Sequence, residues 1–193
     1  LLAGGALVAF PTETVYGLGG DARSDLAVAR IYEAKGRPSF NPLIVHLPDL
    51  AAVEKIATLG PNARALARAF WPGLLTLILP PNPILSPALR ASQVALRVPN
   101  FPMLLPLFDA VGGFLFATGA ICCGEGPAIT AREAAKLFGH DVGLILDGGR
   151  APFGIPSTIV DCIPDPPEIR RRGVIPEEKI WEAVGITPPR EVT

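Results

Sequence analysis

Cysteine is scarce in this sequence, and the few that occur form no recognisable framework. Cys122, Cys123 and Cys162 are odd in number and two are adjacent, which excludes a regular disulfide pattern and the spacing of a zinc site. Long hydrophobic runs are missing too, because no apolar stretch approaches the ~18 residues of a membrane span. We therefore expect reduced thiols, no signal sequence, a cytoplasmic protein and no membrane partner.

A dominant charge of one sign is also absent. The chain has 17 Lys and Arg against 18 Asp and Glu, so no global basic field indicates nucleic-acid binding, although Arg170–Arg172 form a local basic run. The 193 residues predict one domain, 1–185, followed by a tail or the start of a linker at 186–193. Since the first residue is Leu1 and not Met, we expect further residues upstream.

Three common signatures of nucleotide and hydrolase sites are missing. The sequence has neither the phosphate loop GxxxxGK[ST] nor the dinucleotide pattern GxGxxG, and it has no nucleophile elbow. Any nucleotide chemistry must therefore depend on separate cations and loops.

What the sequence does contain is an alternation of short apolar runs and helical patterns, which predicts an α/β domain. Its sheet is expected to be twisted, partly parallel and buried on both faces. The predicted strands are Ala6–Phe10, Leu43–Leu47, Leu74–Leu79, Val94–Val98, Phe114–Ala117, Leu144–Leu146 and Thr158–Cys162, with a last strand around Arg171. The predicted helices are Asp25–Lys35, Asp49–Thr58, Pro61–Phe70, Phe101–Val111, Ala131–Phe138 and Glu177–Val184.

The segment Phe10–Gly19, FPTETVYGLG, is the densest group of polar side chains between apolar elements. It follows a predicted strand, at a position where ligands often bind in α/β sheets. Gly17 and Gly19 allow close approach of the backbone to a ligand. An ordinary polar turn whose hydroxyls cap the backbone explains the pattern equally well. The side-chain oxygens belong to Thr12, Glu13, Thr14 and Tyr16.

A second polar segment follows the first predicted helix. Lys35 and Arg37 lie at its end, and Asn41 and His46 follow them. Cations at helix ends are usually solvated, and a histidine within a strand is more often a core residue than a catalyst. Arg97 is less easily explained, because an arginine inside the apolar strand VALRVP needs a partner or a ligand.

Seven sequence blocks in order carry a family resemblance. They are PTETVYGL, KGRPxxNPLIVH, FWPGxLTL, VALRVP, DGG, GxPSTIVD and RxGxI, between about Gly4 and Trp181. This series resembles the YrdC/Sua5/TsaC family of threonylcarbamoyl-adenylate synthases. The resemblance implies a YrdC-like twisted mixed sheet, flanked by helices, with a large concave groove for ligands.

The resemblance also implies an activity and its partners. Family members convert L-threonine, bicarbonate and ATP, with Mg²⁺ on the phosphates, into threonylcarbamoyl-AMP and pyrophosphate. The product passes to transferase proteins that modify adenosine 37 of tRNA, and tRNA itself is a further candidate partner. Carried over by position, the threonine ligands are Thr12, Thr14, Tyr16, His46, Arg97 and Ser157. The ATP ligands are Lys35, Arg37, Asn41 and Arg171, with Lys35 and Arg37 catalytic and no protein metal ligand.

One block departs from the family. Where members carry a SANxSG-like segment, this chain reads TGAICCG, with Gly119 for the first serine, Ile121 for the asparagine and Cys123 for the second serine. Thr118 or backbone groups could substitute, the segment could be a sequence artefact, or the protein could be a non-catalytic relative. This last alternative is an RNA-binding or regulatory domain, to which Arg170 and Arg172 add positive charge.

Overall fold

The computed structural model describes residues 1–35, 43–82, 93–121 and 126–187. The predicted ligands Arg37 and Asn41, the cysteines Cys122 and Cys123, and most of the predicted tail lie outside these ranges.

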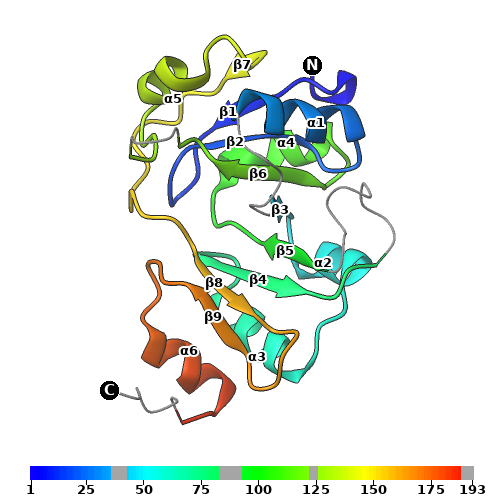
Figure 1. Cartoon of the computed structure of the whole chain (residues 1–193), viewed down its shortest axis with the longest axis vertical. Coiled ribbons are helices and arrows are strands. Elements are labelled where there is room, and N and C mark those ends of the chain that lie inside the picture. Colours follow the sequence, from blue (N-terminus) through cyan, green and yellow to red (C-terminus); the bar gives the residue numbers. More distant parts are fainter. Residues whose placement is uncertain (36–42, 83–92, 122–125, 188–193) are drawn as a thin grey trace.

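A mixed sheet forms the centre of the described chain, and Figure 1 shows it running from β7 at one end of the molecule to β9 at the other. Its strands are β1 (Val8–Phe10), β2 (Gly17–Asp21), β3 (Ile44–His46), β4 (Leu75–Leu79), β5 (Val94–Arg97), β6 (Leu115–Gly119), β7 (Leu144–Ile145), β8 (Thr158–Asp161) and β9 (Glu168–Arg171). Their order is β7-β1-β2-β6-β3-β5-β4-β8-β9. The pairs β1/β7, β3/β5 and β4/β8 are parallel and the others antiparallel, which confirms the predicted fold class.

The helices follow the predicted ranges closely, because the sequence marks most of their ends. Ser24 caps α1 by accepting a hydrogen bond from the Ala27 N–H, and Thr130 with Glu133 forms a capping box on α5. The helical elements are η1 (Leu2–Gly4), α1 (Asp25–Ala34), α2 (Leu50–Ile56), α3 (Pro61–Phe70), η3 (Pro102–Leu104), α4 (Leu105–Ala110), α5 (Ala131–Phe138) and α6 (Glu177–Val184). The predicted helix Phe101–Val111 is divided into η3 and α4, because Pro106 has no N–H for a helical bond to Pro102.

The central strands are buried on both faces, as expected, although the two faces have different surroundings. Side chains such as Val45, Leu77 and Leu96 point into the main core, to which α1, α2, α3, α5 and α6 contribute. On the opposite face, α4 covers part of β1 and β6. Because side chains alternate along a strand, the intervening residues of the central strands lie on this less covered face.

The strand that the sequence did not predict is β2. Its sequence, GLGGD, is rich in glycine, which is depleted in strands. A Cβ at Gly19 would overlap the carbonyl oxygen of Phe116 on the neighbouring strand β6. Gly19 therefore allows close approach of another strand and not, as expected, of a ligand.

Within the described ranges, no helix is both long enough and apolar enough to cross a membrane.

Replacing Gly19 with alanine should destabilise the sheet, because the new methyl group meets backbone that cannot move aside. We expect Gly19→Ala to lower the free energy of unfolding by at least about 2 kcal/mol, measured by urea denaturation. Gly4→Ala is the matched control, since a Cβ there meets no atom within 4 Å. Equal stability of the two variants would contradict this account of β2.

Candidate active site

A cavity of about 430 Å³ lies over the less covered face of the sheet. Its floor includes Ile44 and His46 of β3, Ile78 of β4, Arg97 of β5 and Ile159 of β8, the alternates of the core-facing positions. Loops after β1 and β6 and the end of α1 complete the wall. Every predicted site residue that the structure describes lines this cavity: Thr12, Thr14, Tyr16, Lys35, His46, Arg97, Ser157 and Arg171. Their roles toward ligands stay predictions.

Arg97 is the buried cation of the cavity floor, with 3% of its side chain exposed. Its Nε donates to the Gly73 carbonyl and its Nη1 to the Thr14 hydroxyl, both at 2.9 Å. Its Nη2 lies 2.8 Å from Oε1 of Glu13. Burial lowers the pKa of Arg97, and the charge of Glu13 acts in the opposite direction. The arginine that the apolar strand VALRVP made conspicuous thus has an internal carboxylate as its partner.

The two threonines of the β1–β2 loop have different tasks. Thr12 Oγ1 donates to the Val15 carbonyl at 2.6 Å and faces the N–H groups of Thr14 and Val15. Because its only proton is used there, the 2.8 Å contact with Thr14 Oγ1 has Thr14 as donor. Thr12 therefore fixes the loop through local bonds, as the polar-turn interpretation expected. Thr14 is held between Thr12 and Arg97 at the cavity wall.

His46 lies opposite Arg97 in the β3/β5 register and is 4% exposed. Burial, and next the charge of Arg97, lowers its pKa to about 3. Its Nδ1 is 3.1 Å from the Ile44 carbonyl, an acceptor, so Nδ1 carries the proton of the neutral ring. The Nε2 atom is consequently a hydrogen-bond acceptor.

Ser157 connects the other side of the cavity to two neighbours. Arg171 donates through Nε to the Ser157 carbonyl at 3.0 Å and through Nη2 to its hydroxyl at 3.1 Å. The hydroxyl also contacts Thr76 Oγ1 at 2.8 Å. Burial, and next the charge of Arg97, lowers the pKa of Arg171. The two arginines therefore repel each other, and an anion between them would relieve that repulsion.

Lys35, which follows α1, contacts the altered segment TGAICCG, called the altered loop below, whose first residues Thr118 and Gly119 end strand β6. Its Nζ donates to the Gly119 carbonyl at 2.7 Å and to Thr118 Oγ1 at 3.1 Å. The lysine contacts of this loop thus come from a backbone carbonyl and a threonine, in line with the substitution by Thr118 that the sequence left open.

Gly119 and Ile121 of the same loop are sterically coupled. A Cβ at Gly119 would lie 3.1 Å from Cδ1 of Ile121, closer than most real contacts. Ile121 itself lines the cavity, so an apolar side chain occupies part of the wall where a hydrogen-bonding residue was expected.

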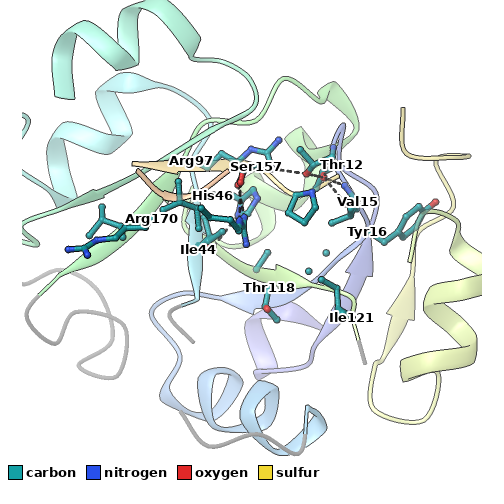
Figure 2. A pocket seen from close by; sticks show the side chains of 18 of the residues that line it. Thr12, Val15, Tyr16, Ile44, His46, Arg97, Thr118, Ile121, Ser157 and Arg170 are labelled. Atoms are coloured by element: carbon teal, nitrogen blue, oxygen red, sulfur yellow. Dashed lines mark hydrogen bonds between the residues drawn. The ribbon is translucent and has the colours of Figure 1, made fainter. Parts of the chain in front are cut away.

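Tyr16 is turned away from these groups, as Figure 2 shows. Its hydroxyl donates to the Gly149 carbonyl at 2.8 Å and accepts from the Gly148 N–H at 3.3 Å. The phenol therefore ties the β1–β2 loop to the DGG turn. In this arrangement its hydroxyl does not point to a ligand beside Arg97.

The charges around the cavity favour an anionic ligand. Among the described lining residues are four cations and no carboxylate: Lys35, Arg97, Arg170 and Arg171. Arg170 is paired with Asp161 and Glu168, however, and Arg172 with Glu177. The positive charge of both extra arginines is thus partly offset by acidic neighbours.

The sequence interpretation did not assign two residues that hold the site together. Glu13 was noted only as an oxygen in a polar loop, although a buried arginine needs a counter-ion. Thr76 was not considered, and its signal was a single hydroxyl inside the apolar strand LTLIL.

Among the described residues, no group of three or more His, Cys, Asp or Glu could hold a metal ion. The described wall therefore offers no ligand set for a protein-bound Mg²⁺.

Comparison with curated proteins finds relatives along almost the whole chain. "Threonylcarbamoyl-AMP synthase" of Bacillus subtilis is 43% identical over 96% of this chain and 55% of its own length. The protein of the same name from Pyrococcus abyssi is 40% identical over 94% of this chain and 54% of its own length. The chain thus spans about half the length of these relatives.

A solved structure gives the same result. The crystal structure of P. abyssi Sua5 complexed with L-threonine superimposes with a TM-score of 0.90 and 38% identity, covering 95% of this chain and 55% of that one. A family model for Sua5, YciO and YrdC proteins, described as "Telomere recombination", matches residues 1–173. The chain belongs to the Sua5/YciO/YrdC family.

Proposed function

We propose that this chain is the catalytic domain of an L-threonylcarbamoyladenylate synthase, a nucleotidyltransferase that makes threonylcarbamoyl-AMP and pyrophosphate from L-threonine, bicarbonate and ATP. The observation that carries the proposal is one cavity lined by a buried arginine, a neutral histidine and three further cations. The names of the relatives and the threonine-bound P. abyssi structure support the same substrates.

The threonine half of the reaction uses groups on the sheet and the β1–β2 loop. Arg97 and Ser157 receive the carboxylate, with Thr14 beside them. His46 Nε2 accepts a hydrogen bond from the amine or the hydroxyl of threonine, because its ring is neutral. The neutral amine nitrogen attacks the carbon of dissolved CO₂ and loses a proton to solvent, or attacks bicarbonate, from which a C–O bond breaks and water leaves. Either route gives a carbamate.

The nucleotide half joins two anions. A carbamate oxygen attacks the α-phosphorus of ATP, and the bond to the β-phosphate breaks as pyrophosphate leaves. Lys35 and Arg171 reduce the repulsion between the partners, so positioning and charge stabilisation supply the acceleration. Arg37 and Asn41 are the further ATP ligands that the sequence predicts.

Further partners follow from this activity. Mg²⁺ enters on the phosphate oxygens of ATP, since the described cavity offers it no carboxylate set. The product passes to transferase proteins that modify adenosine 37 of tRNA, in the cytoplasm.

The proposal is tested by incubating the protein with ATP, L-threonine, bicarbonate and Mg²⁺. We expect pyrophosphate and threonylcarbamoyl-AMP in equal amounts, detected by mass spectrometry, and neither when threonine is omitted. Lys35→Met should lower kcat by roughly 100-fold, because the variant loses one positive charge that stabilises the negative charge of the leaving pyrophosphate. Pyrophosphate release independent of threonine, or no release at all by folded protein, would contradict the proposal.

The buried neutral histidine should make stability depend on pH. Unfolded His46 binds a proton near pH 6.5, but the folded pKa is about 3, so the unfolded state gains a proton as the pH falls between these values. The free energy of unfolding should therefore fall by up to about 1.4 kcal/mol per pH unit in this range. His46→Gln should make the slope between pH 6 and 5 shallower in urea titrations, whereas replacing exposed His140 should leave it unchanged. Parallel slopes for wild type and His46→Gln would refute the neutral buried ring.

The altered loop predicts a non-additive reversion. Gly119→Ser alone brings its Cβ against Ile121, and Ile121→Asn alone leaves the serine missing. Together they should raise kcat/KM for ATP roughly tenfold, as one or two recovered hydrogen bonds allow, and leave KM for threonine unchanged. A folded double variant no more active than wild type would show that this segment does not limit nucleotide use, and one no better than the better single variant would contradict the coupling.

A further inference from the structure

Glu13 lies behind Arg97 and outside the cavity. It lines a neighbouring hollow, together with Trp71, Asn100 and Phe153, and not the cavity wall. Its Oε1 accepts the Asn100 N–H at 2.9 Å and lies 2.8 Å from Arg97 Nη2. Its Oε2 and Arg97 Nη2 have no aligned hydrogen-bond partner among the described residues. The pair is thus close in distance but incompletely hydrogen-bonded, so its main effect is electrostatic.

This arrangement limits how an anion can bind Arg97. A guanidinium has two edges that bind a carboxylate bidentately, Nε with Nη2 and Nη1 with Nη2. Both edges include Nη2, which is buried against Glu13, and Nε is already bonded to Gly73. Nη1 bonds Thr14, which lines the cavity. A substrate carboxylate therefore meets the guanidinium at Nη1, with the charge of Glu13 behind it, and a bidentate contact is not available in this arrangement.

We propose that Glu13 is a positioning residue that sets the affinity of the cavity for the substrate carboxylate by remaining paired with Arg97. The proposal rests on the proposed function, because threonine supplies the carboxylate. Glu13 supports the buried cation when the cavity is empty and weakens its attraction for an incoming anion. The product keeps the carboxylate of threonine, so the same attenuation favours product release.

The test is Glu13→Gln, which keeps the volume and the Oε1 acceptor for Asn100 but removes the charge. Without ligand the variant should melt roughly 5 °C or more below wild type, because Arg97 loses its counter-ion. Calorimetry should show threonine binding on the order of tenfold tighter, as the substrate carboxylate takes over the pairing. KM for threonine should fall and KM for ATP should not change. Saturating threonine should raise the melting temperature more in the variant than in wild type.

Two controls separate this effect from a general loss of structure. Asp21→Asn is the matched variant, because Asp21 also joins an arginine and a backbone N–H but does not line the cavity. It should leave threonine affinity unchanged. L-Threoninamide, which lacks the carboxylate charge, should bind Glu13→Gln and wild type equally.

The outcomes distinguish the two proposals. Wild type that does not bind threonine contradicts the proposed function. Wild type that binds it, with equal or weaker binding by Glu13→Gln, overturns only the role of Glu13, since a merely structural residue would lower stability and affinity together. If Glu13→Gln folds only in the presence of threonine, the inference is supported. If it does not fold at all, Glu13→Asp decides, because its longer ion pair should tighten threonine binding and an unchanged or weaker affinity overturns the inference.

Discussion

The buried charge of Arg97 is the constraint on which the arrangement of the site depends. A guanidinium that is 3% exposed in a sheet must have its donors used and its charge balanced, or the fold loses several kcal/mol. Gly73 and Thr14 accept hydrogen bonds from Nε and Nη1, and Glu13, beside Thr14 in the β1–β2 loop, balances the charge. The Arg97 side chain therefore links the β1–β2 loop to the end of β5. Burial, and next this charge, lowers the pKa of His46 and of Arg171, which keeps the histidine neutral.

The position of the cavity follows from the period of two along a strand. In β3, β4 and β5, Val45, Leu77 and Leu96 face the helices, so their neighbours lie on the other face. Where α4 covers that face, over β1 and β6, it is apolar and closed. Over the remaining strands it carries His46 and Arg97 instead, and loops complete the cavity. A histidine and an arginine can be accommodated among the isoleucines of this floor because the opposite face buries apolar surface against the helices.

Local signals account for what could be predicted from the sequence. Helix ends were readable because Ser24 and the Thr130–Glu133 box act within one turn. The arginine in VALRVP predicted a buried charge in need of a partner. Its partner Glu13 and the hydroxyl contact of Ser157 with Thr76 could not be read in this way, since they depend on strands far apart in sequence. Strand β2 was missed because its glycines serve a tertiary contact with β6, which no local propensity records.

The altered loop separates the two halves of the site. Lys35 is bonded to the carbonyl of Gly119, a contact that any residue at that position supplies, and to Thr118. Among the described residues, the hydrogen-bond partners of the Arg97 and Ser157 side chains are Gly73, Thr14, Thr76 and Arg171, none of which belongs to this segment. We therefore expect the missing serine and asparagine to affect the proposed nucleotide side and not the proposed threonine side. A side chain at position 119 would crowd Ile121, so the effect of changing one of these two residues depends on the other.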